Sequence, residues 1–170
     1  MDLRLFQLIN QLSGHNWIVD KLMILISNRI RYLYISLLVV FLIKNRFKKR
    51  LTVEAGGSIL YALFIHFLFK LFVYKPRPFK KRRVGILIPS KMDSTFPSKH
   101  TLLAFAVSTT IFLYHRTLGI FMFSMSGLTG FSRIWIGHHY PSDIIGSAFL
   151  GSFSGVVTHI LSGKNSGQEN

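Results

Sequence analysis

Long runs of apolar residues, separated by short polar or basic breaks, constrain this chain more than any other feature of its sequence. Nearly half of the residues (49%) are hydrophobic and 16 are phenylalanine, which is more than a soluble domain of this size usually carries. The clearest blocks are 51–74, 98–114, 118–131 and 144–161. Because a membrane-spanning helix needs about 20 mainly apolar residues, we predict an all-α, polytopic transmembrane helical bundle. It has one membrane-embedded domain over 1–162 and a polar tail over 163–170.

The N-terminal part is harder to divide into spans. Residues 3–12 place their apolar side chains roughly on one helical face and are too short to cross a membrane, so we predict an amphipathic surface helix there. Two shorter apolar blocks, 17–27 and 32–43, flank a polar break at 28–31. These two blocks could form a transmembrane hairpin, a tilted helix or a re-entrant segment. The predicted bundle therefore has five or six spans in total. Asp20 and Lys21 are expected at headgroup level.

The basic residues predict both the partners and the orientation of the bundle. The net charge is +15, and the basic residues lie mainly between the apolar blocks, which favours membrane lipids and an anionic ligand over nucleic acid. The basic loop 44–50 is predicted to be cytoplasmic. Counting crossings from it places the loops 75–97 and 132–140 together on the outer face. The loop 75–97 is itself basic, a conflict that eases if part of its charge holds an anionic substrate.

Polar clusters at the ends of three blocks would meet at that surface. They are Lys70 with Arg77, then Ser98 with Lys99 and His100, then Arg133 with His139 and Asp143. Guanidinium groups match phosphate oxygens in pairs, lysine adds a point charge, and a helix beginning after Pro97 would offer N–H groups to an anion. The residues therefore predict a phosphate held by these cations and the Ser98 hydroxyl, with two histidines available for chemistry.

The spacing of His139, Pro141 and Asp143 indicates how one histidine is activated. Pro141 is favourable at the first position of a helix, where its missing N–H costs nothing. A helix that begins there places Asp143 in its first turn, close to His139. A carboxylate within hydrogen-bond reach fixes the tautomer of an imidazole and raises its basicity, as for a nucleophile or a general base. The alternative is that Asp143 only caps the helix.

These positions also follow one another in a family pattern. The chain contains Lys70-x6-Arg77-Pro78, Pro97-Ser98-x-His100 and Ser132-Arg133-x5-His139-x3-Asp143. This pattern resembles the three-part signature of the type 2 phosphatidic acid phosphatase superfamily, a family of membrane lipid phosphatases related to vanadium haloperoxidases. The resemblance implies that His139 attacks the terminal phosphorus to form a phosphohistidine and that Asp143 orients it. It further implies that His100 protonates the leaving oxygen and then helps to activate water.

The same resemblance implies a metal-independent reaction without a cofactor. Lys70, Arg77, Ser98 and Arg133 would bind the phosphoryl oxygens, in the places that Mg²⁺ fills elsewhere. A zinc site from His138, His139 and Asp143 is disfavoured because the nearby cations would repel the metal. His138 is expected to be a neighbour of the site and not a catalyst. The chain has no cysteine, so thiolate chemistry is excluded.

The stretch G-F-S-R-I-W-I-G-H-H-Y-P-S-D, together with the small size of the chain, is similar to undecaprenyl-diphosphatases of the bacitracin-resistance type. That resemblance implies hydrolysis of undecaprenyl diphosphate to the monophosphate and inorganic phosphate, which would recycle the cell-wall carrier lipid at a bacterial plasma membrane. A phosphatase for phosphatidate, phosphatidylglycerophosphate or another lipid phosphate is the alternative in the same class. A non-catalytic polybasic membrane tether and half of a transporter are the alternatives in other classes.

One residue departs from the family pattern. The middle motif usually reads Pro-Ser-Gly-His, and here Lys99 replaces the glycine. Lys99 can still offer its backbone N–H to phosphate if its backbone angle permits. Its ammonium either adds charge for a diphosphate or points to lipid headgroups.

Overall fold

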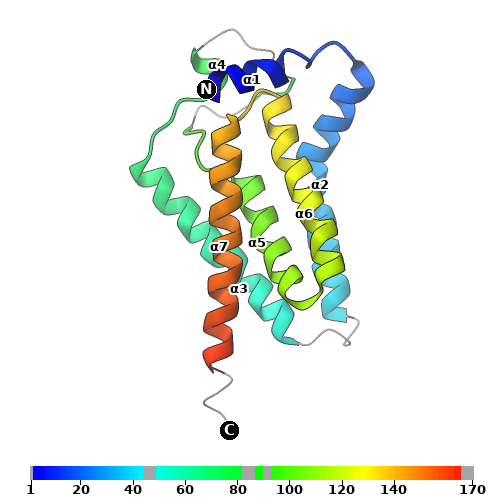
Figure 1. Cartoon of the computed structure of the whole chain (residues 1–170), viewed down its shortest axis with the longest axis vertical. Coiled ribbons are helices and arrows are strands. Elements are labelled where there is room, and N and C mark those ends of the chain that lie inside the picture. Colours follow the sequence, from blue (N-terminus) through cyan, green and yellow to red (C-terminus); the bar gives the residue numbers. More distant parts are fainter. Residues whose placement is uncertain (1, 44–48, 82–86, 90–92, 166–170) are drawn as a thin grey trace.

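The computed structural model describes residues 2–43, 49–81, 87–89 and 93–165 of the chain. All regular structure in these residues is helical (Figure 1). The helices are α1 (Asp2–Asn10), α2 (Trp17–Ile43), α3 (Lys49–Phe72), α4 (Pro78–Lys81), α5 (Lys99–Tyr114), α6 (Arg116–Trp135) and α7 (Pro141–Asn165). The all-α fold class is thereby confirmed for the described part of the chain.

Among the described residues, two helices are long and apolar enough to cross a membrane, namely Arg50–Phe72 within α3 and Pro141–Gly163 within α7. The bent helix α2 is a third candidate if its two halves count as one span. The predicted five or six spans therefore remain a prediction. Helix α7 continues to Asn165, past the boundary predicted for the polar tail, and the last five residues lie outside the described part.

The hairpin interpretation of 17–43 is wrong, because these residues form the single helix α2. Its segments Trp17–Ile30 and Tyr32–Val40 meet at a bend of 43°. The polar break between the two apolar blocks contains neither glycine nor proline, and asparagine and arginine are tolerated within helices. Polarity alone therefore does not end the helix here.

Helix α5 occupies the centre of the bundle and packs against α3, α6 and α7 (Figure 1). Small residues allow the closest approach, between α5 and α7. A Cβ atom on Gly151 would lie 2.2 Å from the carbonyl oxygen of Leu102, and one on Gly155 would lie 2.9 Å from that of Ala106. These glycines of α7 thus form a packing surface, as is common between membrane helices.

Large apolar side chains cover the outside of the bundle, while hydroxyl groups lie inside it. Phe64 on α3 and Phe149 on α7, for example, are more than half exposed. Between α2, α5 and α6, the hydroxyl of Ser126 is 2.6 Å from Tyr34 Oη and 2.8 Å from Ser108 Oγ. Exposed phenylalanine around a core joined by hydroxyl hydrogen bonds is the pattern expected of helices surrounded by lipid.

Helix α1 lies across one end of the bundle, in agreement with the prediction of a surface helix (Figure 1). Its Phe6 is fully buried and meets the ring of Tyr140 at 5.6 Å between centroids. Nearby, Asp20 at the start of α2 accepts a hydrogen bond of 2.8 Å from Trp135 Nε1 and one of 2.9 Å from the backbone N–H of Gly14. The carboxylate of Asp20 is therefore buried and joins α2 to α6 at this end of the bundle, and its expected position at headgroup level stays a prediction.

The two ends of the bundle receive different connections. The described parts of the α3–α5 connection and the α6–α7 loop lie at the end covered by α1, whereas the α5–α6 turn and the C-terminal end of α7 lie at the opposite end (Figure 1). This is the grouping expected from counting crossings along the chain. Most of the basic loop on which that count was based, residues 44–48, lies outside the described residues.

Candidate active site

Every predicted site residue lies at the end of the bundle that α1 covers. Lys70 is in the last turn of α3, Arg77 directly precedes α4, Ser98 caps α5, Lys99 and His100 open α5, Arg133 is in the last turn of α6, His139 is in the α6–α7 loop, and Asp143 is in the first turn of α7. Adjacent helices of the bundle run in opposite directions. The polar ends of alternate apolar blocks are therefore brought together.

The loop between α6 and α7 holds His139 in the protein interior. Gly137 takes a positive φ of 83°, as glycine commonly does just after a helix. The backbone N–H groups of His138 and His139 then both donate to the carbonyl oxygen of Arg133, at 3.1 and 3.3 Å. This folds the loop back over the end of α6 and leaves the His139 side chain 3% exposed.

Asp143 is fully buried and lies where the sequence predicts, in the first turn of a helix that begins at Pro141. It does cap that helix, since its Oδ2 accepts the backbone N–H of Tyr140 at 3.0 Å. The expected direct contact with His139 is replaced by a hydroxyl group. Thr95 Oγ1 lies 2.8 Å from Asp143 Oδ2 and 3.1 Å from His139 Nδ1. The sequence did not indicate Thr95.

Burial and nearby guanidinium groups keep the loop histidines uncharged. Burial lowers the pKa of the His139 imidazole, and the charges of Arg133 and Arg77 lower it further, well below its usual range. Burial and then Arg133 also lower the pKa of His138, to about 4. His138 contributes its Nε2 to a 2.8 Å hydrogen bond with the carbonyl of Ile88. A neutral, buried His139 has the protonation state that a nucleophile needs.

Arg133 presents an unused hydrogen-bond donor. Its side chain is buried, and one terminal nitrogen donates to Ser27 Oγ on α2 at 2.7 Å. Its Nε is buried and has no hydrogen-bond partner among the described residues. A buried N–H without an acceptor is costly and rare in folded proteins. An anion bound beside Arg133 would supply the missing acceptor.

Asp93 holds the first predicted cluster together. Lys70 Nζ donates to its Oδ2 at 2.9 Å, and Arg77 NH2 donates to its Oδ1 at 2.7 Å. Burial acts to raise the pKa of Asp93, but the hydrogen bonds from Lys70 and Arg77 outweigh it and lower the pKa. Asp93 was not among the residues predicted for the site. The scarcity of acids in this basic chain, 6 in total, is the one sequence signal that marks it.

Ser98 begins α5 and connects it to α7. Its backbone N–H donates to Ser147 Oγ at 2.7 Å, and that hydroxyl donates to the carbonyl of Asp143 at 2.5 Å. The Ser98 hydroxyl is 3.1 Å from that of Thr101. Lys99 is exposed at the start of α5, and His100 beside it is half-buried.

Lys75, which was not among the predicted site residues, donates a hydrogen bond to the other oxygen of Asp143. Its Nζ lies 2.7 Å from Asp143 Oδ1, 2.8 Å from Ser142 Oγ and 3.2 Å from Asp2 Oδ2. Burial acts to lower the pKa of Lys75, but the bonds to Asp143 and Asp2 raise it above its usual value. Asp2 also accepts the backbone N–H of Ser142 at 3.0 Å. Helix α1 is thereby joined to the first turn of α7.

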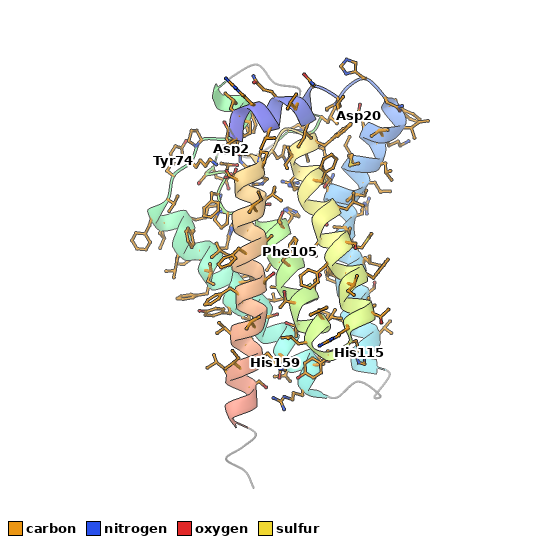
Figure 2. The ribbon with its side chains drawn as sticks, in the orientation of Figure 1. Asp2, Asp20, Tyr74, Phe105, His115 and His159 are labelled. Atoms are coloured by element: carbon orange, nitrogen blue, oxygen red, sulfur yellow. The ribbon has the colours of Figure 1, made fainter. Side chains whose placement is uncertain are left out.

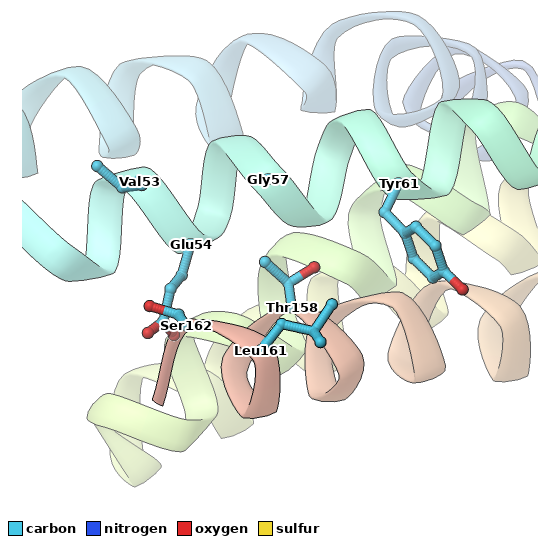
Figure 3. Close-up of a pocket in the computed structure, with 7 residues that line it drawn as sticks. All are labelled: Val53, Glu54, Gly57, Tyr61, Thr158, Leu161 and Ser162. Carbon is cyan, nitrogen blue, oxygen red and sulfur yellow. The ribbon is translucent and has the colours of Figure 1, made fainter. Parts of the chain in front are cut away.

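A second charged cluster lies at the far end of the bundle, where Figure 2 shows His115 and His159 well away from Asp2. Glu54 accepts a hydrogen bond from Arg50 Nε, one helical turn before it, at 2.9 Å and lies 2.7 Å from His159 Nδ1. An open cavity of about 320 Å³ adjoins this cluster between α3 and α7, and Figure 3 shows residues that line it. None of the predicted site residues lines this cavity.

The fold gathers histidine, serine and basic side chains at one end of a bundle of apolar helices. The chain belongs to the PAP2 superfamily, whose sequence profile matches residues 51–166. It is 36% identical to "Undecaprenyl-diphosphatase BcrC" of Bacillus subtilis over 92% of this chain and 82% of that protein. These relationships make it a lipid phosphatase.

Solved structures agree with the family assignment. The crystal structure of Aquifex aeolicus LpxE superposes with a TM-score of 0.78 at 26% identity, covering 92% of this chain and 93% of that one. A PAP2-type phosphatidylglycerolphosphate phosphatase of Bacillus subtilis has the same fold, with a TM-score of 0.74 at 16% identity, and the match covers 96% of this chain and 85% of that one.

Proposed function

We propose that this protein hydrolyses undecaprenyl diphosphate to undecaprenyl phosphate and inorganic phosphate through a phosphohistidine on His139. One observation carries the proposal. His139 is buried and kept neutral beside Arg133, whose Nε has no acceptor among the described residues. A neutral imidazole next to an unsatisfied guanidinium is suited to attack on a bound phosphoryl group.

In the proposed first step, His139 Nε2 forms a bond to the terminal phosphorus as the bond from phosphorus to the leaving oxygen breaks. His100, in the first turn of α5, donates a proton to that oxygen. In the second step, His100 takes a proton from a water molecule, and the oxygen of that water attacks the phosphohistidine. The bond from phosphorus to His139 Nε2 breaks, which releases inorganic phosphate and restores His139. Lys70, Arg77, Ser98, Lys99 and Arg133 stabilise the charge on the phosphoryl oxygens, so no metal or cofactor takes part.

The substrate assignment rests on the relatives and on the surface of the bundle. The identity of 36% to a protein named as an undecaprenyl-diphosphatase supports an isoprenoid diphosphate. Exposed phenylalanines on α3 and α7 allow a lipid tail to remain in the bilayer while its headgroup enters at the helix ends. The proposed location is a bacterial plasma membrane with the site on the outer face, where hydrolysis recycles the carrier lipid for cell-wall synthesis.

Phosphate release by the purified protein in detergent with EDTA tests this proposal. Undecaprenyl diphosphate, phosphatidate and phosphatidylglycerophosphate are compared, with His139→Ala as control. We expect strong preference for the isoprenoid diphosphate and full activity in EDTA. A preference for a glycerolipid would retain the chemistry and reject the substrate. Activity that is lost in EDTA and restored by added metal would reject the metal-free mechanism, and no release from any lipid would favour a tether.

The orientation has its own test. The chain has no native cysteine, so Lys81→Cys at the end of α4 introduces a single thiol near the site. An impermeant thiol reagent should label it in intact cells. Labelling only after lysis would place the site on the cytoplasmic face, whatever the substrate.

A further inference from the structure

A buried hydroxyl outside the three family motifs lies between the proposed nucleophile and its carboxylate. Thr95, in the connection that leads to α5, is fully buried. Its Oγ1 is 2.8 Å from Asp143 Oδ2, 3.1 Å from His139 Nδ1 and 3.4 Å from the carbonyl oxygen of His138. Its backbone N–H donates to the carbonyl of Lys75 at 2.8 Å. Hydrogen bonds of both the backbone and the hydroxyl group therefore fix the position of Thr95.

The single hydroxyl proton determines the direction of these bonds. A carboxylate is a stronger acceptor than a carbonyl, and Asp143 Oδ2 is also much nearer than the carbonyl of His138. Thr95 therefore donates to Asp143, and its oxygen is left as an acceptor for His139. The nitrogen facing it, Nδ1, must then carry the hydrogen. The lone pair of the imidazole is at Nε2, on the other side of the ring.

Both oxygens of the Asp143 carboxylate accept hydrogen bonds from groups other than the His139 ring. Asp143 Oδ2 accepts from Thr95 and from the backbone N–H of Tyr140, and its Oδ1 accepts from Lys75. These bonds fix the carboxylate to the start of α7. The backbone of Thr95 also hydrogen-bonds the His139 imidazole, and the Thr95 hydroxyl is the group that bridges the carboxylate of Asp143 to that ring.

We propose that Thr95 is a positioning residue, which fixes the Nδ1–H tautomer of His139 and transmits the charge of Asp143 to the nucleophile. This inference rests on the function proposed above. When Nε2 bonds to phosphorus, the bond from phosphorus to the leaving oxygen breaks and the ring becomes an imidazolium. The Nδ1 proton stays on the ring. The chain from Nδ1–H to the hydroxyl to the carboxylate strengthens as the ring gains charge, and this stabilises the transition state.

Matched substitutions separate this role from simple packing. Thr95→Val keeps the shape and removes the hydroxyl, whereas Thr95→Ser keeps the hydroxyl. We expect Thr95→Val to lower kcat about 10- to 100-fold with KM changed less than about 3-fold, since the lost bond acts on the charged ring. We expect Thr95→Ser to retain kcat within about 5-fold, because the β-methyl only restricts the rotamer. A Thr95→Val enzyme with wild-type kcat would overturn the proposal.

A second measurement reads the tautomer in the wild-type protein and does not require a folded Thr95 variant. In the wild-type protein labelled with ¹⁵N-histidine, the His139 signals, assigned by their loss in His139→Gln, should show hydrogen on Nδ1. Hydrogen on Nε2 would overturn the proposal directly. Failure of the proposed function looks different, because the wild-type protein would then release no phosphate from any lipid while the tautomer of His139 could still be measured.

Discussion

The two ends of the bundle each hold a buried carboxylate with an arginine and a histidine, but their charges are matched differently. At the far end, the two oxygens of Glu54 are taken by Arg50 and His159, and these three groups satisfy one another. At the end covered by α1, four cations gather around His139 and Asp143, namely Lys70, Lys75, Arg77 and Arg133. There Arg133 Nε is left without an acceptor among the residues that the structure describes.

This difference separates an ion pair that joins helices from a site that awaits an anion. A matched cluster gains little from a further charge, because its donors and acceptors are already used. An excess of buried donors is costly unless a ligand supplies acceptors. Substitutions of the same residue type at the two ends should therefore have very different effects on turnover.

The histidines give the largest contrast. His139→Ala should lower turnover at least about 1,000-fold, because the proposed nucleophile is lost. His159→Ala at the far end should leave kcat within about 2-fold of wild type, since it touches no part of the proposed site. Phosphate release measures both, and near-UV circular dichroism checks that each protein is folded. Equal losses in the two folded variants would remove the distinction between the ends.

The arginines give the next contrast. Arg133→Lys should lower kcat/KM about 10- to 100-fold, because an ammonium cannot replace the planar fork on a phosphoryl group. Arg50→Lys can keep a charge beside Glu54 and should change kcat/KM less than about 2-fold. The same assay with undecaprenyl diphosphate compares them. Normal kinetics in Arg133→Lys would place this arginine outside the phosphate site and give its buried Nε another explanation.

A histidine is buried at the site end, His138, and another is exposed at the far end, His115. This difference predicts that the free energy of unfolding depends on pH through His138. The pKa of His138 is lowered to about 4 in the folded protein, so between that value and 6.5 the unfolded chain binds a proton that the folded one does not. Stability is therefore complete above pH 6.5 and decreases as the pH falls. From pH 7 to 5 the loss from His138 is about 2 kcal/mol. Thermal unfolding in detergent should show this loss, and His138→Gln should reduce it.

His115→Gln is the matched control for that experiment. His115 is exposed at the far end, so its replacement should leave the decrease between pH 7 and 5 unchanged. If His138→Gln and His115→Gln have the same effect, the burial of His138 does not cause the acid sensitivity.

The gathering of the site could be predicted from the sequence because its residues occur at the ends of apolar blocks. Once those blocks are helices that run in alternating directions, chain direction alone brings Arg77, His139 and Asp143 to one end. The all-helical fold followed from the same pattern. The continuity of α2 did not, because a polar break between apolar blocks predicts a loop only when it also contains residues that stop a helix.

The contacts within the site could not be predicted, because they depend on single polar residues in irregular segments. Thr95 lies 48 residues from Asp143, and Asp20 lies 115 residues from Trp135. No periodicity or spacing connects such pairs. Lys75 was one of several lysines in a basic loop, and its three oxygen partners come from α1 and α7.

The smallest effect is expected for Asp93, which supplies the one carboxylate opposite Lys70 and Arg77 among the described residues. Because these cations keep the pKa of Asp93 below its usual value, the carboxylate is charged at neutral pH and competes with phosphate for them. Asp93→Asn keeps the shape and removes the charge, so it should lower the inhibition constant of inorganic phosphate about 3- to 10-fold. Glu54→Gln removes a carboxylate at the far end and should leave that constant unchanged. Weaker phosphate inhibition in Asp93→Asn would show that Asp93 orients the two cations for the substrate and does not compete with it.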